Sequence, residues 1–119
     1  MIFGIGIDLI EISRFRKIKQ SFINKVFTRQ EINYLQNKNL ESWAGIFAAK
    51  EAVAKSLGTG FKFFFICDIE ILHDKQNAPK VKIYNNALYI FQENNISKIH
   101  VSISHTKKTA IAFAIAESN

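Results

Sequence analysis

The chain has 119 residues, of which 48% are hydrophobic and 22% charged, a balance typical of one folded domain and not of a disordered segment. The single cysteine, Cys67, excludes an internal disulfide framework and a cysteine zinc cluster, and no apolar run reaches the roughly 18–20 residues that span a bilayer. Because the apolar N-terminus also lacks the basic stretch of a secretory signal, we expect one domain, 1–119, in the reducing cytoplasm with no membrane partner.

The formal net charge of +6 comes from one segment of the chain. Between Arg14 and Lys38, seven basic side chains stand with a single acid, Glu31. A basic excess this local indicates a face for an anionic partner. Nucleic acid, an acidic protein and a phosphorylated ligand all satisfy this description, and composition does not choose among them.

The N-terminal elements begin with a glycine-containing strand. Residues 2–7 are apolar and mostly β-branched, and Gly4 and Gly6 leave one face open to the close approach of a backbone or ligand. Asp8 follows where we expect this strand to end. A helix is then expected from about 11 to 22, with its basic residues outward, and Thr28 with Glu31 forms the capping box of a further short helix.

The strongest helical pattern runs from about 40 to 57, where apolar residues recur at three- and four-residue steps and Gly58 supplies a stop. The C-terminal third predicts a β-rich stretch, a strand, a helix and a hairpin of two strands around Lys107 and Lys108, with bounds 63–72, 81–84, 85–94, 99–106 and 109–116. The expected class is α+β, a mostly antiparallel sheet with helices packed on one face.

Glu51 is the most unusual position in the long helix, because it lies on the apolar stripe that includes Phe47 and Ala54. A carboxylate there is costly unless it is paired, protonated or bound to a metal. Lys55, one turn later, offers an ordinary intrahelical ion pair as the alternative. Asp8 has two interpretations as well, a cap for the following helix or, together with Glu51, a ligand of Mg²⁺.

At the other end of the chain, His105 closes an alternating strand beside Thr106 and two lysines, a grouping suited to phosphate. His73 and His100 have no such neighbours, and we interpret them as surface or structural residues. The sequence has no G-x-S-x-G elbow, no dinucleotide fingerprint and no Walker A motif.

Together these segments resemble the bacterial holo-acyl-carrier-protein synthases, the short trimeric type of 4′-phosphopantetheinyl transferase. The resemblance covers essentially the whole chain, and its most specific part is a K-E-A-x-x-K helix paired with an upstream G-I-D. The matching stretches are Ile5-Gly6-Ile7-Asp8, Arg14, Phe27-Thr28 with Glu31, the run from Phe47-Ala48-Ala49-Lys50-Glu51 to Gly58-Thr59-Gly60, Asp68-Ile69-Glu70-Ile71 and Val101-Ser102-Ile103-Ser104-His105-Thr106.

The resemblance implies transfer of phosphopantetheine from coenzyme A to a serine of apo-acyl carrier protein, with release of adenosine 3′,5′-bisphosphate, in support of fatty acid biosynthesis. Asp8 and Glu51 would hold Mg²⁺, and Lys55 would approach the pyrophosphate. The general base stays open between a metal-organised water, Glu51 and Lys55. By the same resemblance, coenzyme A would be bound by Phe47, Ala48, Lys55, Gly58, Pro79, His105 and Thr106.

The resemblance also suggests which anionic partner binds the basic segment, because acyl carrier proteins are small and acidic. Arg14, Lys17, Ile18 and Phe22 are expected to meet the carrier. The resemblance also implies a homotrimer with active sites between subunits. Three positions depart from the family pattern: Ile46 where an arginine is usual, Asn77 where a glycine is usual, and a short phenylalanine-rich loop at 61–65.

Two other interpretations remain at this stage. A small nucleic-acid-binding domain would use the local positive charge, but the chain has no helix-turn-helix, RRM or KH signature and this interpretation leaves Glu51 unexplained. An inactive homologue of the transferase is the second alternative. The presence of Asp8, Glu51 and Lys55 argues against it, although Ile46 leaves it open.

Overall fold

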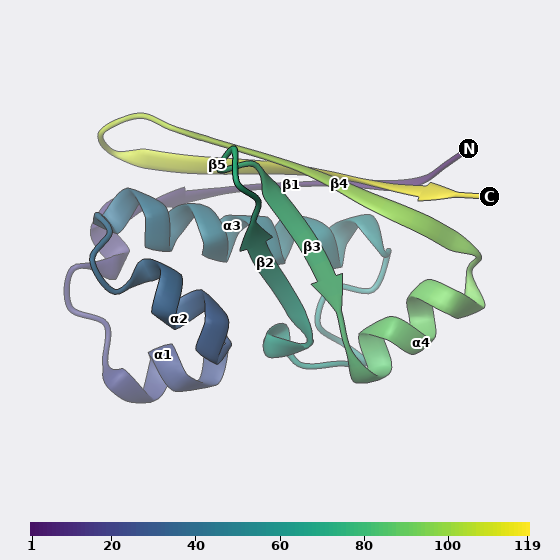
Figure 1. Ribbon diagram of the computed structural model, residues 1–119, viewed down its shortest axis with the longest axis horizontal. Coiled ribbons are helices and arrows are strands. Elements are labelled where there is room, and N and C mark those ends of the chain that lie inside the picture. Colours follow the sequence, from purple (N-terminus) through teal and green to yellow (C-terminus); the bar gives the residue numbers. More distant parts are fainter.

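The fold is built around the long helix α3, which lies across one face of a three-stranded antiparallel sheet (Figure 1). The computed structural model describes residues 1–119. The sheet has the order β1-β5-β4. Its strands and the helix have the bounds β1 Ile2–Glu11, β4 Ile96–His105, β5 Thr109–Ser118 and α3 Leu40–Ser56.

Small residues allow α3 to approach the sheet closely. Every second residue of β5 on the helix side is a fully buried alanine, from Ala110 to Ala116. On β1, a Cβ added to Gly6 would collide with the carbonyl oxygen of Ala52, and one added to Gly4 with that of Ser56. The predicted open face of this strand is therefore filled by the backbone of α3.

The remaining elements lie on the same side of the sheet as α3 (Figure 1). They are two further antiparallel strands, β2 Ile69–His73 and β3 Pro79–Ile83, three short helices, α1 Gln20–Val26, α2 Arg29–Leu35 and α4 Asn85–Glu93, and two 3₁₀ turns, η1 Ile12–Phe15 and η2 Ile66–Asp68. The predicted α+β class, antiparallel pairing and one-sided helices are confirmed. No helix combines the length and apolar character that a membrane span needs.

Several predicted elements are confirmed in detail. Helix α3 spans 40–56 and Gly58 follows with a φ of 82°, as the stop signal indicated. Both halves of the capping box form between Thr28 and Glu31. The C-terminal hairpin pairs His105 with Ala110 at its closed end.

The helix expected at 11–22 is wrong. Strand β1 continues through Asp8 to Glu11, because it pairs with β5 along its whole length as far as Thr109. A short 3₁₀ turn follows, with Ile12 and Phe15 buried, and α1 begins only at Gln20. The β-rich expectation at 63–72 was likewise too long, since the strand starts at Ile69.

A buried ion pair joins α2, α3 and β2 beneath the site. The Lys50 ammonium donates to Glu31 Oε1 at 2.6 Å, and neither side chain is exposed. Glu31 also accepts from the backbone N–H of Thr28 and, at 2.7 Å, of Ile71. Burial raises the pKa of Glu31 and lowers that of Lys50, and the attraction within the pair opposes both shifts.

The opposite face of the three-stranded sheet is apolar and uncovered. On β1 it presents Ile5 and Leu9, whose exposed fractions are 60% and 65%, and on β5 it presents Phe113. Several large apolar side chains exposed on one sheet face make this face a candidate surface for association.

Candidate active site

Asp8 and Lys55 meet where the edge strand β1 crosses the end of α3. Asp8 lies on the α3 side of β1, in step with Gly4 and Gly6, and its side chain is 18% exposed. The Lys55 ammonium donates to the carbonyl oxygen of Ile7 at 2.9 Å and to Asp8 Oδ1 at 3.3 Å. Asp8 is therefore inside a strand and is not the helix cap that the sequence offered as an alternative.

Glu51 belongs to the same cluster, one turn before Lys55 on α3. Partial burial raises the pKa of Glu51, the nearby charge of Asp8 raises it further, and Lys55 opposes both effects. The ion pair that forms at Lys55 joins it to Asp8 across the two elements, so the intrahelical Glu51–Lys55 pair does not account for Glu51. The predicted convergence of Asp8, Glu51 and Lys55 is what the fold produces.

Two neighbouring carboxylates fit a magnesium ion that shares its shell with a substrate. No group of three or more His, Cys, Asp or Glu side chains is placed to enclose a metal. Mg²⁺ commonly takes one or two carboxylates and completes its shell with phosphate oxygens and water. The donor set of Asp8 and Glu51 therefore suits a metal that arrives with a phosphorylated ligand.

The other predicted residues of α3 lie around this cluster in different environments. Phe47 is half-buried and packs edge-on against Phe15, with ring centroids 5.6 Å apart. Ala48 is fully buried, so its side chain does not reach the surface. Gly58 is exposed just beyond the helix. The coenzyme A roles of these residues stay predictions.

The remaining predicted coenzyme A residues lie at the opposite edge of the sheet. Pro79 and His105 line a cavity of about 220 Å³ beside β4. His105 and Thr106 border a second, more open hollow at the hairpin turn. Strand β5 lies between β1, which carries Asp8, and β4, which carries His105.

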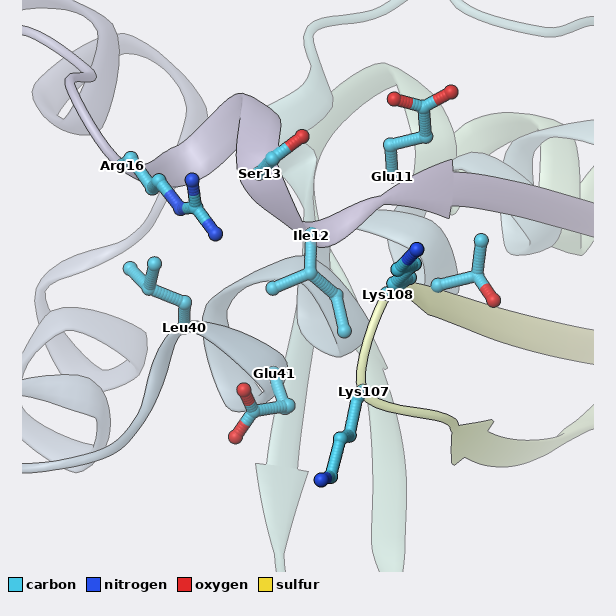
Figure 2. A pocket seen from close by; sticks show the side chains of 9 residues that line it. Glu11, Ile12, Ser13, Arg16, Leu40, Glu41, Lys107 and Lys108 are labelled. Carbon is cyan, nitrogen blue, oxygen red and sulfur yellow. The ribbon is translucent and has the colours of Figure 1, made fainter.

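A third hollow, of about 480 Å³, lies between η1, the start of α3 and the hairpin turn (Figure 2). Side chains of both charges line it, the cations Arg16, Lys107 and Lys108 and the acids Glu11 and Glu41. Glu41 also lines the two hollows near His105, so all three adjoin one another. This arrangement provides cations at the hairpin turn for an anionic group.

Two of the departures from the family pattern fall in the cavity beside β4. Ile46 is buried and lines this cavity. Asn77 has a φ of 65°, a left-handed conformation that asparagine tolerates better than most residues. A further feature of this cavity was not predicted from the sequence: the ring of Tyr34 stacks on that of His73, with ring centroids 4.1 Å apart. No sequence pattern links residues this far apart on different elements.

The predicted carrier surface lies on η1, α1 and the loop between them. Arg14 and Lys17 are exposed, and Ile18 and Phe22 are half-buried against the core. Phe22 packs against Phe47 with centroids 6.1 Å apart, which connects this surface to the α3 face that holds Glu51. The carrier contact itself stays a prediction.

Comparison with known proteins gives one consistent result. The family model described as "4′-phosphopantetheinyl transferase superfamily" matches residues 4–116. The holo-[acyl-carrier-protein] synthase of Caldicellulosiruptor saccharolyticus is 51% identical and that of Halothermothrix orenii 46% identical, each over 98% of both chains.

Solved structures agree with these matches. The holo-[acyl-carrier-protein] synthase of Neisseria meningitidis has a TM-score of 0.90 at 32% identity and covers 99% of this chain and 100% of its own. The Helicobacter pylori synthase in complex with coenzyme A has a TM-score of 0.84 at 32% identity, over 95% of this chain and 99% of its own.

Proposed function

The chain belongs to the 4′-phosphopantetheinyl transferase superfamily and is an enzyme of that family, and from this premise we propose which reaction it performs. It transfers the 4′-phosphopantetheine group of coenzyme A to a serine of apo-acyl carrier protein and releases adenosine 3′,5′-bisphosphate. The observation that carries this proposal is the convergence of Asp8, Glu51 and Lys55 where β1 crosses α3. The serine nucleophile comes from the carrier, so this chain needs none of its own.

Asp8 and Glu51 would hold Mg²⁺ together with the pyrophosphate of coenzyme A. When bound, the metal supplies charge neutralisation at the phosphate oxygens of the leaving group. Burial, and after it the charge of Asp8, raises the pKa of Glu51, so a cation bound between the two carboxylates would stabilise their charged forms.

Lys55 adds a second positive charge at the same place. Its ammonium is about half exposed and is held by the Ile7 carbonyl and by Asp8, so it is oriented toward the cluster before substrate arrives. A lysine contributes a point charge to a phosphate without bidentate geometry. The proton of the attacking serine could pass to Glu51, or to Lys55 in its neutral amine form, and these are alternatives to a water held by the metal.

We propose that two copies of the chain together complete the site. Asp8 and Glu51 lie at the β1 edge and Pro79, His105 and Thr106 at the β4 edge. An edge-to-edge arrangement of copies would unite the two sets, and the uncovered apolar face of the sheet offers a surface for association. We propose a homotrimer with active sites between subunits.

The basic segment would receive the carrier. Arg14 and Lys17 present positive charge at the surface while Ile18 and Phe22 add apolar area beside them. Charge complementarity of this kind steers an acidic partner and fixes its orientation. We propose that this surface binds the carrier and that the enzyme acts in fatty acid biosynthesis. We also propose a cytoplasmic setting, because Cys67 is a free thiol. No observation favours nucleic acid over this partner.

The proposal is tested with coenzyme A that carries a fluorescent pantetheine label. Wild type should label an apo-carrier and should not label a carrier whose acceptor serine is alanine. Glu51→Gln should lower labelling by more than the ~10–100-fold that loss of an outer-shell metal partner costs. Glu93→Gln, an exposed change of the same type on α4, is the matched control.

A second measurement separates metal binding from chemistry. Calorimetric titration with coenzyme A should show tighter binding in Mg²⁺ for wild type and no effect of Mg²⁺ for Glu51→Gln. If Glu51→Gln keeps both its metal-dependent binding and its labelling, the assignment of Glu51 is wrong.

A further inference from the structure

A fourth hollow, a groove of about 280 Å³, lies between β3, α4 and the start of β4. Helix α4 connects the end of β3 to the start of β4, and the two strands border the groove without pairing with each other (Figure 1). The groove shares no lining residue with the three hollows of the candidate site. It is therefore a separate feature of the surface, which the proposed reaction does not use.

Most of the groove lining is apolar. The apolar side chains are Val81, Ile83, Leu88, Phe91 and Ile99. All of them except Ile99 are only half-buried, and Leu88 does not pack against the hydrophobic core. An apolar ligand in the groove would remove this partly exposed surface from water, which is favourable.

The polar part of the lining is cationic. It consists of Lys80, Lys82 and Lys98 with Ser97, and no acidic residue lines the groove. All three lysines are exposed, and of these three only Lys80 forms an ion pair, with Asp74 at 3.9 Å. The charges of Lys82 and Lys98 are therefore available to an anion.

The apolar lining and the lysines together select one kind of ligand. Inorganic phosphate would leave the apolar lining uncovered, and a neutral hydrocarbon would leave the lysines without an opposite charge. The groove is slightly smaller than the roughly 300–1,000 Å³ of sites for drug-sized ligands, and it is too small to enclose a helix, which is about 10–12 Å across with its side chains. A single alkyl chain that ends in a carboxylate meets both requirements.

We infer that this groove binds the anion of a fatty acid, with the alkyl chain on the apolar lining and the carboxylate at Lys82 and Lys98. Lysine suits this contact because its stem covers apolar surface while its ammonium stays at the edge and meets the carboxylate. The inference does not depend on the proposed reaction, since the ligand lies outside the candidate active site.

The first test is calorimetric titration of wild type with octanoate, decanoate and dodecanoate, each below its critical micelle concentration. The affinity should rise by roughly 4-fold for each added methylene that the groove buries. Dodecyltrimethylammonium, which has the same chain length and the opposite charge, should bind far more weakly than dodecanoate. Equal binding of these two ligands would show that the chain alone adsorbs, and would overturn the inference.

The second test reverses the charge of the groove. An exposed ion pair contributes up to roughly 5-fold in affinity, and reversal adds repulsion, so Lys82→Glu with Lys98→Glu should weaken dodecanoate binding by roughly 10-fold or more. Lys62→Glu with Lys75→Glu gives the same net charge at exposed positions outside the groove and should bind as wild type does. Equal affinities of the two double variants would contradict the assignment.

A measurement on wild type locates the ligand without any variant. The methyl resonances of Leu88 should shift when dodecanoate is added. Shifts confined to Ile5 and Leu9 would place the ligand on the uncovered sheet face and would overturn the inference. Carrier labelling by wild type is measured separately, so failure of the groove to bind dodecanoate leaves the proposed function intact.

Discussion

At the scale of single residues, the chain holds charges in two different environments. Asp8, Glu51 and Lys55 are partly open to solvent, so their charges are available to a ligand. The pair of Glu31 and Lys50 is fully buried and already satisfied by hydrogen bonds. Lys50 and Glu51 are adjacent on α3 but differ in role. Lys50 stabilises the core, and Glu51 is available for chemistry.

Removing one partner of the buried Glu31–Lys50 pair should lower the unfolding free energy far more than removing both partners. Lys50→Met leaves the Glu31 carboxylate buried without its cation, which typically costs about 3–5 kcal/mol of unfolding free energy. The double variant Glu31→Gln with Lys50→Met removes both charges and should recover much of that loss. Urea unfolding measures both. A double variant less stable than Lys50→Met would contradict the buried pairing.

The half-buried imidazole of His73 gives the stability of the folded chain a defined pH dependence. Its pKa is lower in the folded state than the usual value of about 6.5, so the unfolded chain binds this proton more readily. The contribution of His73 to stability is therefore complete above about pH 6.5 and is lost as the pH falls below it. Wild type should lose more stability than His73→Phe between about pH 7.5 and pH 5.5 in urea unfolding. Equal losses would show that His73 does not titrate in this way.

At the scale of elements, the contact between β1 and α3 sets the geometry of the site. Gly6 brings the strand against the carbonyl oxygen of Ala52, two residues before Asp8 along the strand. The position of Asp8 relative to Glu51 therefore depends on a backbone contact that only glycine permits.

Replacing this glycine should separate the two elements. Gly6→Ala places a Cβ against rigid helix backbone, and overpacking of this kind costs about 1–3 kcal/mol or more. Gly45→Ala is the matched comparison, because its Cβ would meet a side-chain methyl group, Cγ2 of Ile103, and no backbone atom. Thermal unfolding should show the larger loss for Gly6→Ala, together with weaker carrier labelling. A Gly6→Ala chain as stable as Gly45→Ala would contradict the close packing.

Local sequence signals predicted the elements that depend on local structure. The period of α3, the capping box of α2 and the alternation of the β4–β5 hairpin all correspond to observed elements. Strand β1 was predicted to stop before Asp8, because its last residues are extended only through their pairing with β5. The loop at 61–65 is rich in phenylalanine, and local composition suggested strand where the chain forms turns.

In the candidate site too, features that depend on local sequence could be predicted and features that depend on tertiary packing could not. The apolar stripe of one helix was enough to single out Glu51, whereas the meeting of Asp8 with Glu51 and Lys55 was expected only from the resemblance to the holo-acyl-carrier-protein synthases. The stack of Tyr34 on His73 depends on how α2 packs beside β2, and neither residue has an unusual sequence context. Its place beside β4 could be found only in the folded chain.

At the scale of the whole molecule, the candidate site residues lie on the two edge strands of one sheet. The β1 edge carries the carboxylates, and the β4 edge carries the aromatic cavity and the cationic hairpin turn. A single copy also leaves the apolar face of this sheet uncovered. Assembly would complete the site and bury this face at the same time.

Complementation between variants tests this composite site. Asp8→Asn damages one half-site and His105→Ala the other, so each variant alone should label carrier poorly. Co-expressed chains should form mixed assemblies in which some sites combine two intact halves, and labelling should rise well above that of either variant. Mixing that gives no more activity than the two variants separately, in assemblies shown to contain both, would place the whole site in one chain.

The most direct test of the central claim is the intact mass of an apo-acyl carrier protein after incubation with this chain, coenzyme A and Mg²⁺. The account predicts the addition of one phosphopantetheine group to the carrier, and loss of that addition when EDTA removes the metal. An unmodified carrier, from a folded chain and a carrier that another transferase can load, would contradict the proposed activity. Full addition in EDTA would contradict the role of Asp8 and Glu51 as holders of a metal.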